Sequence, residues 1–327
     1  MRSRRTAKRG PAGSSVGPPV GPPAGPSAEP SAAPRQRGPL LAPLLVVAIA
    51  FMFQTGSALA TKVIGAVGIV DALWLRTALA AFILIAVRPR SLRLPPRRQR
   101  ATVALLALSL LGMNLSFYGA ISVAPLGIVV AIEFGGPLVV AVVGSRRLTD
   151  FVWVALAAAG IAALVGPRGS IGPGGLVLSL SAGLFWGLYL VFGRRAVSTL
   201  EPLHVTTLMV TGSAVLLTPV ALLFAPRLAQ HPSAVALGAV VAALSSAAPY
   251  FVELVALRLV RAATYSVLLS LEPAIAALTG FLLLGQTLNG LELAAIGAVM
   301  IAAGGASWSA ARRHAPAPLP PDGGAPV

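Results

Sequence analysis

The sequence predicts an all-α membrane protein with ten transmembrane helices arranged as two inverted five-helix repeats. Three observations support this fold class: an apolar composition, ten apolar stretches of spanning length, and a one-sided distribution of basic residues. Of the 327 residues, 56% are hydrophobic and only 10% are charged, whereas soluble domains carry about 25% charged residues. Because lipid offers the backbone no hydrogen-bond partners, we expect the spans to be helices.

Each apolar stretch has roughly the 20 residues that a helix needs to cross the hydrocarbon core. In the first half of the chain they cover residues 40–60, 69–87, 101–121, 126–144 and 151–166. In the second half they cover residues 175–193, 204–224, 234–254, 263–285 and 289–309. The alternating segments that are typical of membrane barrels are absent. We therefore expect five helices from each half.

The basic residues indicate how these helices are oriented. If the N-terminus is cytoplasmic, most of the 25 Lys and Arg residues lie on the cytoplasmic side. The exceptions are Lys62, Arg168 and Arg227, which lie outside, and Arg76, which lies within a span. This asymmetry is the positive-inside pattern. It predicts an even number of spans with both termini in the cytoplasm. It also argues against nucleic-acid binding as the reason for the net charge of +16.

Two terminal segments differ in composition from the region between them. Residues 1–38 are rich in Pro, Gly, Ser and Arg, and residues 311–327 are rich in Pro and Gly. We expect both to be disordered cytoplasmic tails, the first of them basic. Between them we expect a first repeat, residues 39–166, and a second repeat, residues 175–310. The chain has no cysteine, which excludes disulfides and thiolate metal sites.

The two halves share a sparse repeat. A shift of 136 positions places Pro137 on Pro273. The same shift aligns three further pairs of small residues, Ala120 with Ala256, Ala141 with Ala277 and Gly144 with Gly280. Because each half has an odd number of spans, the second copy must enter the membrane from the opposite side. Inverted repeats are typical of secondary transporters, which bind substrate near the midplane and work by alternating access.

Glu133 and Glu272 lie inside long apolar stretches. An ionised side chain at the bilayer centre costs roughly 2.5 to 3.5 kcal/mol on insertion scales, so such residues usually face a polar pathway. In the repeat register the two are offset by three residues, about one helical turn. We expect both to point to one central region and to bind a proton or a substrate ammonium group. The alternative is that they are neutral acids bonded to neighbouring backbone groups.

Arg76 is the basic residue within a span, and it is the candidate for binding a substrate carboxylate. Extension of its side chain toward the interface, or a pair with an acid, is an equal alternative. Polar and aromatic residues of other spans are candidates for a cavity lining, with interhelical hydrogen bonding as the alternative role. These candidates are Gln54, Asn114, Tyr118, Trp186, Tyr250 and Tyr265.

Pro137 and Pro273 each free a carbonyl one turn earlier in their helix. This provides either an acceptor for a cation or a simple packing kink. Asp71 and Glu292 lie near span ends, and we expect Asp71 at the membrane interface and Glu292 in solvent. The HExxH, GxSxG and Walker A motifs of enzymes are absent. We therefore expect no enzymatic activity, no catalytic residues, no cofactor and no metal site.

Two segments carry a family resemblance. Residues 112–154, GMNLSFYGAISVAPLGIVVAIEFGGPLVVAVVGSRRLTDFVWV, and residues 245–288, SSAAPYFVELVALRLVRAATYSVLLSLEPAIAALTGFLLLGQTL, resemble the EamA family of the drug/metabolite transporter superfamily. The likeness runs from about residue 40 to 309 and is greatest to the bacterial threonine and homoserine exporters. The chain departs from these exporters in lacking a proline near Arg261 and in its long N-terminal tail.

The resemblance implies a basket of helices in the bacterial inner membrane, with the first four spans of each repeat around a cavity and the fifth and tenth at the periphery. It implies a small amino-acid substrate that is moved outward against protons. Together with the lipid bilayer, these are the expected partners. The alternatives are a drug or other metabolite exporter on the same fold, or a membrane scaffold subunit that does not transport.

Overall fold

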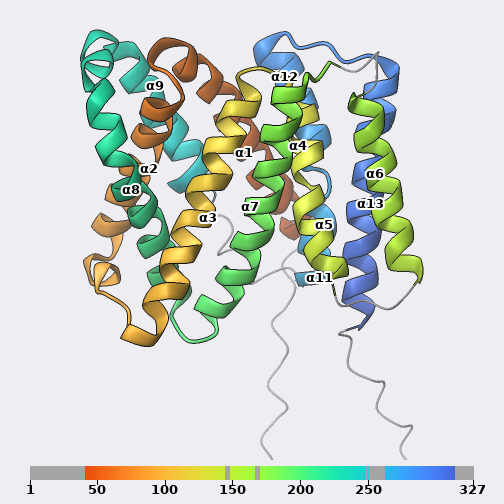
Figure 1. The fold of residues 1–327 in the computed structure, drawn as a ribbon, viewed down its shortest axis with the longest axis horizontal. Coiled ribbons are helices and arrows are strands. Elements are labelled where there is room, and N and C mark those ends of the chain that lie inside the picture. The colour runs from red at the N-terminus through yellow and green to blue at the C-terminus, as the bar shows by residue number, and fades with distance from the viewer. Residues whose placement is uncertain (1–40, 144–147, 166–169, 248, 250–261, 314–327) are drawn as a thin grey trace, which may run out of the picture. The chain divides into compact units, whose positions relative to one another are not determined.

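The structure is a computed structural model, and most of the residues that it describes form helices (Figure 1). The described part comprises residues 41–143, 148–165, 170–247, 249 and 262–313, and it contains no strand. The elements of the first half are α1 (Leu41–Val67), α2 (Ile69–Val87), the 3₁₀ helix η1 (Pro89–Leu92), α3 (Arg97–Ile121), α4 (Leu126–Glu133), α5 (Gly135–Val142) and α6 (Leu148–Val165). Those of the second half are α7 (Pro173–Val197), α8 (Pro202–Gln230), α9 (Pro232–Ala242), the π-helix η2 (Ala243–Ala247), α11 (Ala262–Leu269), α12 (Glu272–Leu284) and α13 (Gly290–Arg313).

Seven helical segments in the described residues are long and apolar enough to cross a membrane. They are Pro43–Val67, Ile69–Val87, Arg97–Ile121, Pro173–Val197, Pro202–Phe224, Val267–Leu284 and Gly290–Ser309. Three shorter apolar segments, Leu126–Val140, Thr149–Val165 and Pro232–Ser246, fall where the remaining predicted spans lie. The chain is therefore a multi-pass helical membrane protein, and the count of ten spans stays a prediction.

Two of the predicted spans have a local defect in their helical hydrogen bonding near the middle, which we call the interruption. The backbone there keeps α-helical dihedral angles, φ −59° and ψ −17° at Phe134 and φ −78° and ψ −12° at Leu271. The segment 126–144 is divided into α4 and α5 at Phe134, and the segment 263–285 is divided into α11 and α12 at Ser270 and Leu271. Proline has no N–H, so Pro137 cannot bond the carbonyl of Glu133, and Pro273 cannot bond that of Leu269. Under the 136-residue shift Phe134 corresponds to Ser270, so both halves are interrupted at matching positions.

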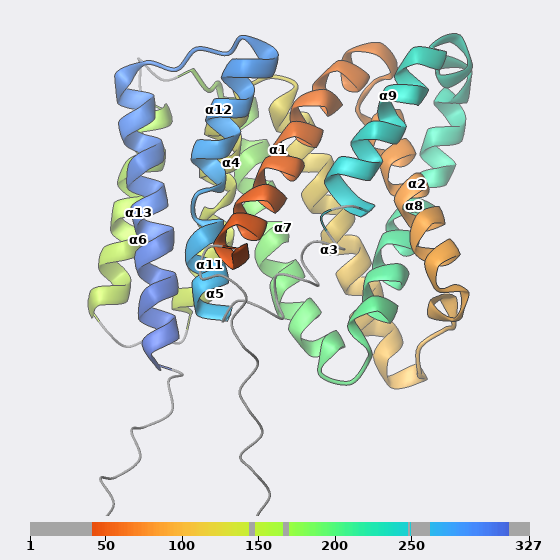
Figure 2. The same cartoon turned by 180° about the vertical axis from the view of Figure 1, so that it is seen from behind.

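The helix contacts follow a matched pattern in the two halves. Helix α1 packs against α9, η2, α11 and α12, and its counterpart α7 packs against α3, α4 and α5. Helices that correspond to each other also pair directly, α2 with α8, α4 with α12, and α6 with α13. Figures 1 and 2 show α6 and α13 side by side. This is the contact pattern that the predicted inverted repeats would produce, and the repeats stay a prediction.

Helix α4 lies in the interior of this packing. All of its residues, from Leu126 to Glu133, are buried. A Cβ added to Gly127 would lie 2.7 Å from the Cα of Ala277, so α4 and α12 meet at backbone distance. The Gln286 side chain after α12 accepts a hydrogen bond from the Leu126 N–H at 2.9 Å, which satisfies one free donor at the start of α4.

Glu292 is buried, with 1% of its surface exposed, so the expectation of a solvated carboxylate is wrong. It forms a capping box with Asn289 at the start of α13: the Asn289 N–H donates to Glu292 Oε2 at 2.8 Å, and the Glu292 N–H donates to Asn289 Oδ1 at 3.0 Å. The backbone N–H and the hydroxyl of Ser170 both donate to Glu292 Oε1. The carboxylate thus joins the start of α13 to the segment before α7.

Replacing Glu292 by Ala is expected to lower the free energy of unfolding by about 2 to 4 kcal/mol. The change removes the charged acceptor of the Ser170 and Asn289 N–H groups, and a hydrogen bond to a charged group is worth about 1.5 to 3 kcal/mol. Thermal unfolding in detergent measures the effect. Glu292→Gln keeps one acceptor oxygen, so its melting temperature should lie between those of the unchanged protein and Glu292→Ala. Equal melting temperatures for all three proteins would contradict the role of the carboxylate.

Candidate functional site

Glu133 occupies the last position of α4, directly before the interruption at Phe134. Its side chain is 8% exposed, inside the packed helices and away from lipid. The Glu133 carbonyl, which Pro137 frees from its helical bond, faces α7: a Cβ added to Gly183 would lie 2.7 Å from this oxygen. Only a glycine lets α7 approach the interruption so closely. The backbone geometry therefore holds Glu133 at the contact between α4, α5 and α7.

Three charged side chains interact in this interior. The Glu133 carboxyl group interacts electrostatically with Glu272, on the first turn of α12, and with Arg76, in the middle of α2. Glu272 is partly buried. Two acids and one base in a low-dielectric interior interact far more strongly than on a solvated surface. The structure thus brings together the two glutamates and the arginine that the sequence singles out, from three different helices.

Arg76 contacts Tyr118 of α3. The guanidinium Nη1 donates to the Tyr118 hydroxyl at 3.4 Å, and Cζ lies 5.6 Å from the centroid of the ring. Tyr118 is completely buried. Arg76 Nε is buried and has no hydrogen-bond partner among the described residues. Arg76 therefore turns toward α3 and the interior, with a donor left to bind an anionic group.

The remaining candidates lie on several helices around this cluster. Asn114 is one turn before Tyr118 on α3, and its amide donates to the Leu110 carbonyl at 2.8 Å. Trp186 of α7 packs edge-to-face on Phe134, with ring centroids 5.0 Å apart, directly beside the interruption. Gln54 of α1 is 5% exposed, and its Oε1 has no hydrogen-bond partner in the described part of the chain.

Tyr265 and Tyr250 are less closely tied to the cluster. Tyr265 of α11 packs against Val46 and Ile49 of α1. Tyr250 lies outside the described residues. Phe134 is a residue that the sequence analysis did not select, because a phenylalanine in an apolar run carries no signal of its own. Its position three residues before Pro137 is the feature that identifies the interruption.

Asp71, which we expected at the membrane interface, lies on the first turn of α2 and is covered by protein, with 1% exposure. Both of its carboxylate oxygens lack a hydrogen-bond partner within the described residues. The charge of Arg227, on the last turn of α8, acts on this carboxyl group. Asp71 and Arg227 are more than 150 positions apart in the sequence, so no local pattern could indicate that they lie near each other.

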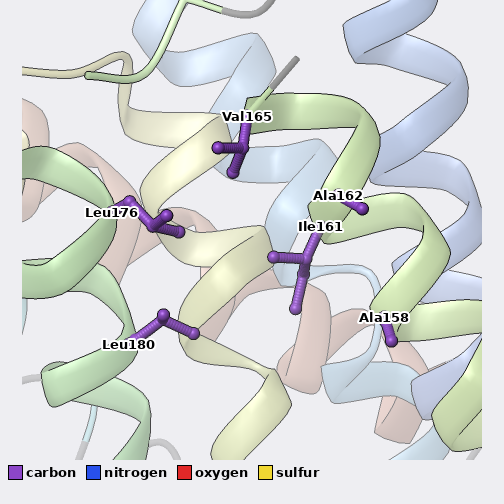
Figure 3. Close-up of a pocket in the computed structure, with 6 residues that line it drawn as sticks. All are labelled: Ala158, Ile161, Ala162, Val165, Leu176 and Leu180. Atoms are coloured by element: carbon purple, nitrogen blue, oxygen red, sulfur yellow. The ribbon is translucent and has the colours of Figure 1, made fainter. Parts of the chain in front are cut away.

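An open pocket of about 540 Å³ lies elsewhere, between α6 and α7 (Figure 3). Its lining consists entirely of alkyl side chains: Ala158, Ile161, Ala162, Val165, Leu176 and Leu180. A zwitterionic amino acid would lose its hydration there without gaining a hydrogen bond. The pocket contains none of the charged candidates, and its chemistry suits an acyl chain better than a polar substrate.

Comparison with known proteins agrees with this architecture. The EamA-like transporter family matches residues 173–308. The chain is 39% identical over 280 residues to the threonine/homoserine exporter RhtA of Salmonella typhimurium (strain LT2), covering 84% of this chain and 94% of the relative. It is 38% identical over 275 residues to the protein of the same name from Escherichia coli (strain K12), covering 82% and 92%. A solved crystal structure superposes with a TM-score of 0.51 at 21% identity, over 85% of this chain and 99% of that chain, which concerns the fold alone.

The apolar helices and the buried charged cluster define a multi-pass membrane protein of the transporter class. With relatives of this identity over nearly their full length, the chain belongs to the EamA-like transporter family. The predicted resemblance is therefore confirmed. The relatives are transporters, which also confirms the prediction that the chain is not an enzyme.

Proposed function

We propose that the protein exports small amino acids such as threonine and homoserine across the bacterial inner membrane, with protons as the coupling ion. The observation that carries the proposal is the interior cluster of Glu133, Glu272 and Arg76 in a chain whose relatives bear the name of threonine/homoserine exporter. A charged cluster of both signs is costly in the membrane interior unless it serves a polar substrate or an ion.

The cluster is chemically complementary to an α-amino acid. Arg76 offers a buried donor, Nε, beside its contact with Tyr118, and it would bind the substrate carboxylate. The two glutamates would bind the substrate ammonium group and a proton. Asn114, one turn from Tyr118, and Gln54 supply amide groups for the substrate side chain. Trp186, Tyr250 and Tyr265 would complete the lining.

The two glutamates differ in their burial, which suggests different roles. Glu133 is 8% exposed, whereas Glu272 is partly buried. Burial disfavours the ionised form of a carboxyl group. Glu133 is therefore the better position for taking up a proton, and Glu272 is the better position for an ionised partner of the ammonium group.

The proposed mechanism is alternating access between two inverted repeats, residues 39–166 and 175–310, with ten spans and both termini in the cytoplasm. The matching helix interruptions and the reciprocal helix contacts support the repeats. The one-sided distribution of Lys and Arg supports the orientation. Substrate would bind at the interrupted helices near the midplane, where free backbone groups and half-helix ends are available.

The two alternatives make different demands on the interior. A drug exporter would need a wide apolar cavity, and a scaffold subunit would need the charges only as structural pairs. Arg76 Nε and Gln54 Oε1 have no hydrogen-bond partner among the described residues, which favours an interior that binds a polar ligand over both the drug exporter and the scaffold subunit.

Counterflow in proteoliposomes tests the proposal. Liposomes loaded with unlabelled threonine should transiently accumulate labelled threonine and homoserine, and a pH gradient should drive net accumulation. Leucine, arginine and an aromatic drug complete the panel. Counterflow with the drug but with no amino acid would favour the first alternative, and no counterflow with any compound would favour the scaffold.

A further inference from the structure

Helices α2 and α8 lie side by side and antiparallel (Figure 2). Each end of this helix pair carries one acid and one arginine. At one end, Arg88 at the C-cap of α2 forms a salt bridge with Glu201 at the N-cap of α8. At the other end, Asp71 on the first turn of α2 faces the charge of Arg227 on the last turn of α8. The two pairs are about 26 Å apart along α2 by helical rise.

The two charge pairs have the same polarity on their helices. Asp71 and Glu201 lie at the N-terminal ends of α2 and α8, and Arg88 and Arg227 lie at the C-terminal ends. The helix dipoles favour these charges at these ends. The pairs are not equivalent in the repeat register, because the 136-residue shift places Asp71 on Thr207 and Arg88 on Phe224.

The two pairs are in different states. Arg88 and Glu201 are in contact, whereas no salt bridge within 4.0 Å joins Asp71 and Arg227. Both oxygens of Asp71 are buried without a hydrogen-bond partner among the described residues. Instead, the Arg227 guanidinium lies over the Phe224 ring, with Cζ 4.9 Å from its centroid. A buried carboxylate without a partner is costly, so a conformation that pairs it has a clear gain.

The surroundings of Asp71 leave Arg227 as its natural partner. The titratable groups on neighbouring elements are Lys62 of α1, which is exposed, and His231 between α8 and α9, which is also exposed and whose Nδ1 contacts the Arg227 carbonyl. Gly68, before α2, has φ 90°, and a Cβ there would lie 3.5 Å from Arg227 Nη1. The guanidinium therefore lies beside the loop between α1 and α2, three residues before Asp71 in the sequence.

We propose that the two pairs are alternating ionic latches, each closing one end of the α2–α8 contact, so that the pair at one end is bonded only while the other is open. This inference rests on the proposed transport function. In the present conformation the Arg88–Glu201 latch, at the end that the charge pattern assigns to the cytoplasm, is closed, and the Asp71–Arg227 latch is open. The helices stay joined near the Asp71 end by a 2.9 Å hydrogen bond from Trp74 Nε1 to Thr218 Oγ1, so only the charge pair itself is open there. Closure of Asp71 on Arg227 accompanies opening toward the cytoplasm.

The natural absence of cysteine makes a direct test possible in the full-length protein. Two variants, Arg88→Cys/Glu201→Cys and Asp71→Cys/Arg227→Cys, are cross-linked in proteoliposomes with a short reagent that is cleaved by reduction. Each cross-link is expected to lower threonine counterflow at least about tenfold relative to the reduced form of the same variant, because alternating access needs both conformations. Reduction should restore the rate, which also controls for folding.

A control variant places the cross-link away from the latches. Trp153→Cys/Ser309→Cys joins α6 and α13, whose side chains are in contact through a 3.2 Å hydrogen bond. This cross-link should change counterflow by less than about twofold. Cross-linked latch variants that transport at the rate of their reduced forms would overturn the proposal.

A second measurement needs no substrate. In a protein with all four latch cysteines, the two cross-links should exclude each other, giving molecules with one or the other and few with both. Both cross-links in most molecules would overturn the latch even if transport itself were absent. Conversely, exclusive cross-links in a protein without any counterflow would contradict the proposed function and leave the latch standing.

Discussion

Glu133→Gln is expected to abolish proton-driven accumulation of threonine while substrate exchange continues. Glutamine has nearly the same shape but cannot take up a proton, and Glu133 lies at the interruption after α4 with 8% exposure, where bulk water cannot replace it. A gradient of one pH unit is worth about 1.4 kcal/mol per proton, which supports about a tenfold accumulation. The variant should reach a concentration ratio near one.

Inverted membrane vesicles with an imposed pH gradient measure this ratio, and counterflow without a gradient measures exchange. Glu272→Gln is the matched control on the other interrupted segment. It should weaken substrate binding and keep the response to the gradient, because the ammonium group and not the proton is its proposed ligand. Gradient-driven accumulation by Glu133→Gln at the level of the unchanged protein would remove Glu133 from the coupling mechanism.

Arg76→Ala is expected to raise the KM for threonine about a hundredfold. Truncating one partner of a buried, hydrogen-bonded charge pair costs roughly 2 to 5 kcal/mol, and each 1.4 kcal/mol is a factor of ten in affinity. Arg76→Lys keeps the positive charge but loses the planar guanidinium group, so its KM should lie between those of the unchanged protein and Arg76→Ala. Initial rates of uptake at several threonine concentrations give these values.

Competition by threoninamide, which lacks the carboxylate, identifies the group that Arg76 binds. The unchanged protein should prefer threonine to the amide, and Arg76→Ala should lose this preference. Tyr118→Phe serves as a second control, because it removes the hydroxyl that accepts from Arg76 Nη1 and keeps the ring beneath the guanidinium. If Arg76→Ala retained the full preference for threonine, the substrate carboxylate would have to bind elsewhere.

Local pattern was sufficient to predict where most helices lie but not how two of them are built. Hydropathy predicts the segment 126–144 as one span, because apolar side chains continue through it. The structure divides it at Phe134, where Pro137 removes a backbone bond and α7 approaches through Gly183. The proline is visible in the sequence, yet whether it kinks or interrupts a helix depends on what packs beside it.

Burial near the helix ends also depended on distant partners. Asp71 and Glu292 have similar sequence surroundings, each close to the start of an apolar stretch, and we expected the membrane interface for Asp71 and solvent for Glu292. In the structure both are 1% exposed. Glu292 is satisfied by Ser170 and Asn289, whereas Asp71 has the charge of Arg227 nearby and no bonded partner in the described chain.

The sequence by itself determined the class of this protein: apolar helices that span a membrane, an EamA-like family, and Glu133, Glu272 and Arg76 as charges that such helices do not tolerate without a reason. These features are local, because hydropathy, charge and proline act through a residue and its nearest neighbours. Only the tertiary structure decided that Arg76 turns to Tyr118, that the three charges interact, and that α2 and α8 hold one bonded and one open charge pair. Those relations join residues on different helices, and the packing of the whole chain sets them.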